Sequence, residues 1–314
     1  MGLSIISIVV FHFTEDCHDS GINYSWLIRF FYTKLGSSSV DVFVILSGFG
    51  LFFALKNNPN IINFYLKRYK RVLIPYLIVA VPSWIARDIF IEDRSISFLL
   101  NDLTFISNKT WFWFIRLILI AYLFYPLLFR VIDKQNSHVY AFIVTAAIYV
   151  VITAITYYLY IYKNDIYDGY QIMLLRFPHF ALGCFLGRLS YHEVSFNKKY
   201  LIVGALLLVP CYFLLHSDLA ITLRYTRAYI NVFLCICFII IFDLIKESPI
   251  KDCFTNILRF FGGITLELYL VHVALRYFFF KFSHPTYQYY NELIMIMISI
   301  VIAYFLNKLL KSFV

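Results

Sequence analysis

The residue of this sequence best suited to proton transfer is His12, which lies near the end of an apolar run, in Val9-Val-Phe-His12-Phe13. Histidine is the side chain that can take a proton from a hydroxyl near neutral pH. A single histidine among apolar residues is also commonly a packing residue. We therefore take His12 as the candidate catalytic residue, with packing as the alternative.

A polar stripe crosses the apolar segment 260–280. Thr265, Tyr269, His272 and Arg276 are spaced by four, three and four residues, which places them within about 60° of one another on a helix. An arginine that faces lipid is costly, so the stripe should face the protein interior. It either lines a functional cavity or hydrogen-bonds to neighbouring helices. Glu267 lies on the other side of this helix, and we expect it to pair with another helix.

Cations are concentrated in Lys67-Arg68-Tyr-Lys70-Arg71, shortly before Pro75. Such a cluster can anchor the chain to anionic lipid on the cytoplasmic side. Arg68 and Arg71 are three residues apart, however, so on a helix their guanidinium groups share a face and could bind one phosphorylated ligand. Both interpretations stay open.

Other ionisable residues lie inside apolar segments, where a charge at membrane depth marks a candidate site. Arg176 is followed by a proline and by Gly183, and its guanidinium requires an anionic or carbonyl partner in either a structural or a ligand-binding role. Asp41 enters the segment 39–55, where it can complement the helix dipole. Ser47 lies beside Gly48 in that segment, a pair that favours close helix packing or a cavity lined by the hydroxyl. Arg116 completes this set.

The elements that must position these residues are apolar and long. Hydrophobic residues make up 61% of the 314 residues, charged residues 14%, and the mean hydropathy is +0.76. This composition predicts an all-α, polytopic membrane protein with about ten transmembrane helices in one domain, residues 1–314. We expect the helices at 1–13, 39–55, 72–91, 111–129, 139–162, 171–187, 200–216, 228–245, 260–280 and 292–310.

The net charge of +9 is mainly a topology signal. With alternating crossings, most Lys and Arg residues lie in the cytoplasmic loops when both termini are cytoplasmic, as the positive-inside rule requires. We therefore expect contact with membrane lipids and no nucleic-acid partner. The six cysteines include no CxxC pair and no metal-ligand spacing, so we predict packing residues and no metal site.

These segments, in this order, resemble the acyltransferase 3 family of integral-membrane acyltransferases, and the resemblance covers essentially the whole chain. The family shows an aspartate and a Ser-Gly-Phe at its second helix, an Arg-x-x-Arg pair before a proline and a Tyr-Leu-x-His sequence near its end. The matching residues here are Val40-Asp41-Val-Phe43-Val-Ile-Leu-Ser47-Gly48-Phe49, Arg68-Tyr-Lys-Arg71, Trp113 to Tyr122 with Pro126, Arg176 with Gly183, and Thr265-Leu-Glu-Leu-Tyr269-Leu-Val-His272.

The resemblance implies transfer of an acyl group, usually acetyl from acetyl-CoA, to a hydroxyl of a cell-envelope polysaccharide or lipid-linked glycan at a bacterial plasma membrane. It implies that His12 is the general base or a transient acyl carrier. It further implies a donor site with Arg68, Arg71 and Arg176. The candidates for orienting substrate or stabilising an oxyanion are Asp41, Ser47, Tyr269 and His272.

The chain departs from the family pattern at one position. The family has an arginine eleven residues before the helix-1 histidine, and Met1 occupies that place here. We therefore expect the native protein to begin upstream of Met1. Two other functions remain as alternatives: a transporter or flippase for a lipid-linked glycan, and a subunit of a glycan-export complex. The transporter predicts flux without consumption of acyl-CoA and little dependence on His12, and in the subunit most polar residues would serve packing between helices.

Overall fold

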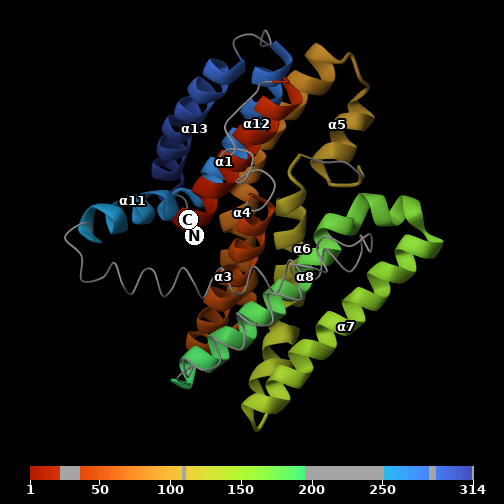
Figure 1. The fold of residues 1–314 in the computed structure, drawn as a ribbon, viewed down its shortest axis with the longest axis vertical. Coiled ribbons are helices and arrows are strands. Elements are labelled where there is room, and N and C mark those ends of the chain that lie inside the picture. Colours follow the sequence, from red (N-terminus) through yellow and green to blue (C-terminus); the bar gives the residue numbers. More distant parts are fainter. Residues whose placement is uncertain (22–35, 108–110, 195–250, 283–287, 313–314) are drawn as a thin grey trace. The chain divides into compact units, whose positions relative to one another are not determined.

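The computed structural model describes residues 1–21, 36–107, 111–194, 251–282 and 288–312, and every regular element in these ranges is a helix (Figure 1). This confirms the all-α class. Among the described residues, six helices are long and apolar enough to cross a membrane, or seven when one bent pair counts as a single span. The helices expected at 200–216 and 228–245 lie outside the described residues. A count of ten and two cytoplasmic termini stay predictions.

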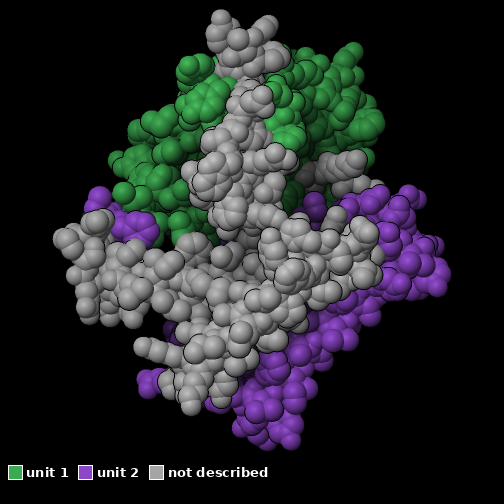
Figure 2. All heavy atoms as spheres, in the orientation of Figure 1, with its two compact units in different colours: residues 1–37, 65–120, 256–314 green, residues 38–64, 121–255 purple. Residues whose placement is uncertain are grey.

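The chain forms two compact units, coloured separately in Figure 2. Unit 1 comprises residues 1–37, 65–120 and 256–314, and unit 2 comprises residues 38–64 and 121–255. Each unit therefore combines segments that are far apart in the sequence. The predicted candidate residues are divided between the two units.

In unit 1, α1 (Gly2–Asp19), α12 (Thr265–Phe282) and α13 (Gln288–Leu310) pack against one another. A small core cluster joins α12 and α13 through Val271, Leu306 and Leu310, and residues of α4 (Ile61–Trp84) pack against it. The π-helix η2 (Ile85–Ile91) follows α4 directly and contacts α5 (Ile96–Leu103). Helix α1 thus lies where its side chains meet those of α12.

Helix α4 begins at Ile61, eleven residues earlier than the predicted start at 72. The Oδ1 atom of Asn60 accepts a hydrogen bond of 3.0 Å from the backbone N–H of Asn63, which satisfies one of the free N–H groups at a helix start. Hydropathy did not predict this part of α4 because residues 61–71 are rich in polar side chains. The consequence is that Arg68 and Arg71 lie on the helix itself, as their use on one face requires.

Helix α1 also exceeds its predicted end, continuing from residue 13 to Asp19. The added residues are polar, so hydropathy ends the segment although the backbone hydrogen bonds continue. The Thr14 hydroxyl donates to the Phe11 carbonyl at 2.7 Å. This extension brings Glu15 and Asp16 into the helix. A further short helix, α5, lies between the helices expected at 72–91 and 111–129.

The predicted helix 260–280 is two helices in the structure. Helix α11 (Lys251–Gly263) and α12 meet at Ile264 with a bend of 67°. The paired glycines Gly262 and Gly263 explain the break, because glycine has a low helix propensity and such pairs favour kinks. The Thr265 hydroxyl donates to the carbonyls of Phe261 and Gly262, both at 2.9 Å, and so compensates backbone groups at the bend.

In unit 2, α3 (Gly36–Asn57) packs against α8 (Asn164–Tyr191), and α7 (His138–Tyr162) packs along α8. Gly48 and Gly183 let the backbones of α3 and α8 approach closely. A Cβ atom added at Gly183 would lie 2.1 Å from the backbone oxygen of Ile45. Close helix packing, one of the two roles expected for the Ser47-Gly48 pair, is therefore confirmed for Gly48, and Gly183 forms the other side of the same contact. Helix α6 (Trp113–Asp133) contributes residues to both units.

Candidate active site

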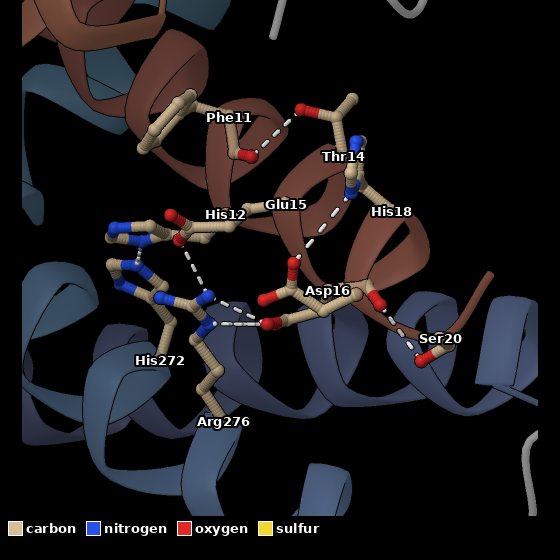
Figure 3. A network of polar contacts seen from close by, with 10 residues as sticks. Phe11, His12, Thr14, Glu15, Asp16, His18, Ser20, His272 and Arg276 are labelled. Atoms are coloured by element: carbon tan, nitrogen blue, oxygen red, sulfur yellow. Dashed lines mark hydrogen bonds and ion pairs between the residues drawn. The ribbon is translucent and has the colours of Figure 1, made fainter. Parts of the chain in front are cut away.

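The centre of the candidate site is a pair of histidines in unit 1 (Figure 3). His12 Nδ1 lies 2.7 Å from His272 Nε2, and the two rings stack with centroids 5.0 Å apart. His272 Nδ1 in turn lies 2.9 Å from the backbone oxygen of Leu268, one turn earlier on α12. His12 is half-buried and His272 is fully buried. Two residues 260 positions apart in sequence therefore form one hydrogen-bonded unit.

One turn beyond this pair, an arginine–carboxylate cluster joins the same two helices. The Nε and Nη2 atoms of Arg276 donate to both carboxylate oxygens of Asp16 at 2.6–2.8 Å, and Nη2 also reaches Glu15 (Figure 3). Asp16 is buried. Charge-assisted, bidentate contacts of this kind fix orientation as well as contributing energy. The cluster therefore holds α1 in a defined register on α12.

Glu15 and Asp16 were missed by the sequence analysis because the first helix was ended at residue 13. A usable signal was present, since Asp16 follows His12 by four residues and therefore shares its helix face. The four-residue step from His272 to Arg276 is the matching signal on α12. The two polar pairs lie on helix faces that meet.

The other members of the predicted stripe have separate contacts. The Tyr269 hydroxyl lies 3.4 Å from the Trp111 carbonyl, and its ring is 6.0 Å from that of His272. The Thr265 hydroxyl donates to the Phe261 and Gly262 carbonyls at the bend. Arg116, which lies on α6 and is not part of the stripe, is buried with its Nη1 atom 3.4 Å from the Phe105 carbonyl. The stripe thus combines interhelical contacts with a histidine that touches the proposed catalytic group.

The expectation that Glu267 pairs with another helix is confirmed. Arg71 on α4 donates through Nη1 and Nη2 to the two carboxylate oxygens of Glu267, which is completely buried. The Arg71 side chain keeps 36% of its surface exposed. Arg68 is half-buried and makes no hydrogen bond or ion pair with any residue in the described part of the chain. Of the two arginines, Arg68 has its charge uncompensated.

Helix α12 orders these contacts along its axis. Glu267 and His272 are five residues apart, which is about 7.5 Å of rise, and Arg276 follows after about 6 Å more. The cationic part of α4 therefore contacts α12 roughly one and a half turns before the histidine pair. Both features belong to unit 1.

Three predicted site residues lie in unit 2. Arg176 Nε is 2.9 Å from Asp41 Oδ1, an ion pair between α8 and α3. Ser47 donates to the Phe43 carbonyl of its own helix at 2.9 Å. His179, one turn after Arg176, is buried with no hydrogen-bond partner on either ring nitrogen among the described residues. The structure thus brings Asp41 and Arg176 together as partners of each other.

A second buried charge cluster in unit 1 was not anticipated. The Arg87 guanidinium is ion-paired with Asp88 and Asp102, and it lies 4.2 Å and 4.8 Å from the ring centroids of Trp84 and Trp111. The π-helix that carries Arg87 leaves no periodicity in the sequence from which these contacts could be predicted.

Beside this charge cluster, Tyr277 donates a hydrogen bond to Glu92 and holds the pKa of that carboxyl below its ordinary value. Arg94 also pairs with Glu92 at 2.5 Å and acts in the same direction. Glu92 follows the π-helix directly. The pair therefore ties the end of η2 to α12.

Comparison with known protein families identifies the chain. The family model described as an acyltransferase domain, acyltransferase 3, matches residues 2–308. The chain belongs to the acyltransferase 3 family. No curated protein and no solved structure shows a significant match to it. Membership establishes that the protein is an acyltransferase, and it confirms the family resemblance noted in the sequence. In this acyltransferase, the match spans every described helix that contributes to the histidine pair.

Proposed function

We propose that this acyltransferase transfers an acetyl group from acetyl-CoA to a hydroxyl of a cell-surface glycan, and that His12 is its general base. The observation that carries the proposal is the histidine pair, in which His272 binds the Nδ1 atom of His12 and leaves the His12 Nε2 atom outside that contact. A packing histidine is hydrogen-bonded as well, so what supports the proposal is that this pair contains the helix-1 histidine that the family resemblance implies as the base.

The reaction can be written with this one base. His12 takes the proton from the acceptor hydroxyl while the hydroxyl oxygen forms a bond to the thioester carbonyl carbon. The carbon–sulfur bond then breaks, the proton passes to the departing sulfur, and the products are an ester and CoA thiol. The charge that develops on the carbonyl oxygen requires a donor, a role in which the Tyr269 hydroxyl is a candidate. A transient acyl group on His12 is the covalent version of the same chemistry.

The donor phosphates are assigned to the cationic face of α4. Arg68 has no partner among the described residues, and the Arg71 side chain stays partly exposed although Glu267 fixes its position. A guanidinium held by a buried carboxylate is pre-oriented, which lowers the cost of binding a phosphate. Arg176 lies in unit 2 and is paired with Asp41, and its part in donor binding stays a prediction.

The test of the activity uses membranes from a host that expresses the protein, incubated with radiolabelled acetyl-CoA and the purified surface polysaccharide of that host. Label in the polysaccharide that alkali releases as acetate supports O-acetyl transfer. Consumption of acetyl-CoA that does not exceed that of membranes from the empty host, with the protein present and several glycans tried, contradicts the proposal and favours transport.

The donor site is tested separately through the apparent KM for acetyl-CoA. We expect Arg68→Ala and Arg71→Ala to raise it about tenfold, the loss of one charge-assisted phosphate contact. Lys70→Ala is the matched control, because Lys70 is exposed on another face of the same helix. An unchanged KM in both arginine variants would show that the donor binds elsewhere.

A further inference from the structure

We infer that His272 is a positioning residue that fixes the proton of His12 on Nδ1 and so leaves the His12 Nε2 lone pair as the reactive base. This inference rests on the proposed function, because it describes how His12 is prepared for acyl transfer. It assigns to His272 a role without substrate contact. The contact of His272 with the Leu268 carbonyl and its contact with His12 together determine which nitrogen carries each proton.

The proton position on His272 is set by the backbone. A carbonyl oxygen can only accept, so the nitrogen 2.9 Å from Leu268 O must carry a hydrogen, and this nitrogen is Nδ1. A neutral imidazole has one donor and one acceptor nitrogen. The Nε2 atom of His272 is therefore an acceptor. The neutral form is the favoured one here, because His272 is fully buried and the Arg276 guanidinium lies one turn away.

The proton position on His12 follows from that of its partner. Because His272 Nε2 accepts, His12 Nδ1 must donate across the 2.7 Å contact. A neutral His12 with its hydrogen on Nδ1 has an unprotonated Nε2. In catalytic triads a carboxylate orients the histidine and fixes its proton. Here the neutral imidazole of His272, itself fixed by the Leu268 carbonyl, does the same for His12.

The same contacts remove an alternative role for His272. Its Nδ1–H is used by Leu268 and its Nε2 by His12, so the neutral ring has no N–H group left for a developing oxyanion. His272 would then influence the reaction only through His12. Among the described residues, the charged and titratable groups near the pair are Glu15 and Asp16 on α1 and Tyr269 and Arg276 on α12. On α13, which packs against both helices, Glu292 lies near Cys17 of α1.

Three substitutions separate the possible roles by the kind of atom that they leave beside His12. His272→Leu preserves bulk and removes the acceptor. His272→Gln offers an amide oxygen close to the former Nε2 position, together with an N–H group. His272→Glu offers only acceptor oxygens.

We expect His272→Leu to lower the rate of acetyl transfer by about 10²-fold or more, because misplacing the proton on a catalytic histidine is costly. His272→Gln and His272→Glu should each remain within about tenfold of the unmodified protein. His272→Glu should also raise the pH at which the rate is half-maximal, since a carboxylate stabilises the protonated ring of His12.

Two results would overturn the inference. If His272→Leu equals or exceeds His272→Gln, the residue serves packing. If His272→Gln is active and His272→Glu is as inactive as His272→Leu, the residue donates a hydrogen bond, as an oxyanion partner would. These outcomes differ from failure of the proposed function, in which the unmodified protein itself transfers no acetyl group.

A measurement without turnover covers the case in which the variants do not accumulate. Diethyl pyrocarbonate acylates an unprotonated imidazole nitrogen, and peptide mass mapping locates the product. In the unmodified protein in membranes, we expect modification of His12 and protection of His272. Modification of His272 ahead of His12 would contradict the assignment of their nitrogens.

Discussion

The arginine–carboxylate cluster next to the histidine pair provides a quantitative test of the site. Arg276 donates four hydrogen bonds of 2.5–2.8 Å to Asp16 and Glu15, and the Asp16 side chain is only 4% exposed. Removing the arginine therefore leaves a buried, unpaired carboxylate. Breaking a buried pair in this way costs about 3–5 kcal/mol. We expect this loss for Arg276→Met.

The double variant distinguishes an ion pair from simple packing. Arg276→Met combined with Asp16→Leu leaves no buried charge, because Glu15 is 30% exposed and reaches water. Replacing both partners with apolar groups is often nearly neutral. The double variant should therefore be more stable than Arg276→Met alone by about 2 kcal/mol or more, which is the expected coupling between partners in contact.

The assay is equilibrium unfolding of the purified protein in mixed micelles, with increasing SDS fraction and a far-ultraviolet signal. Arg259→Met serves as the matched control, since Arg259 lies on exposed α11. Additive effects of the two substitutions, or a cost of Arg276→Met below about 1 kcal/mol, would refute the reasoning that this cluster fixes α1 on α12.

Two further predictions concern other parts of the chain. Gly183→Ala should destabilise the protein by about 1–3 kcal/mol, because the new Cβ would lie 2.1 Å from the backbone oxygen of Ile45. Gly50→Ala should be neutral or stabilising, since nothing lies within 4 Å of its added Cβ. Equal effects of the two in the same unfolding assay would contradict the close approach of α3 to α8. Tyr277→Phe should flatten the pH dependence of stability in acid, because the Tyr277 hydrogen bond lowers the pKa of Glu92. A carboxyl with a lowered pKa stabilises the fold above its ordinary pKa of about 4.3. This contribution is lost as the pH falls through the lowered pKa. The free energy of unfolding of both proteins is measured from about pH 3 to about pH 5, a range around that pKa. Curves that stay parallel over this range would count against the contact.

The sequence predicted the elements whose apolarity is continuous. Helices α6, α7 and α8 lie where the hydropathy of the chain places them, and their starts and ends differ from the expected ones by several residues at most. The polar helical turns of α1 and α4 were not predicted. Backbone hydrogen bonds continue through these turns although the side chains are polar, so hydropathy gives no signal for them.

The candidate site was predicted residue by residue but not in its pairings. His12, Glu267, His272 and Arg276 were all identified as ionisable groups inside apolar segments, and their position at membrane depth is the physical reason that they stand out. Which residues pair depends on helix rotation and register. Those are set by packing between segments up to 261 positions apart, as for Glu15 and Arg276, and local spacing does not encode them.

The measurement that tests the central claim most directly is mass spectrometry of the surface polysaccharide from three hosts. One host expresses the unmodified protein, one expresses His12→Ala, and one expresses His18→Ala, which changes an exposed histidine on the same helix. Membrane levels of the three proteins are compared by immunoblot. We predict an acetyl mass increment with the unmodified protein and His18→Ala, and none with His12→Ala. An equal increment with His12→Ala would contradict the assignment of His12 as the base.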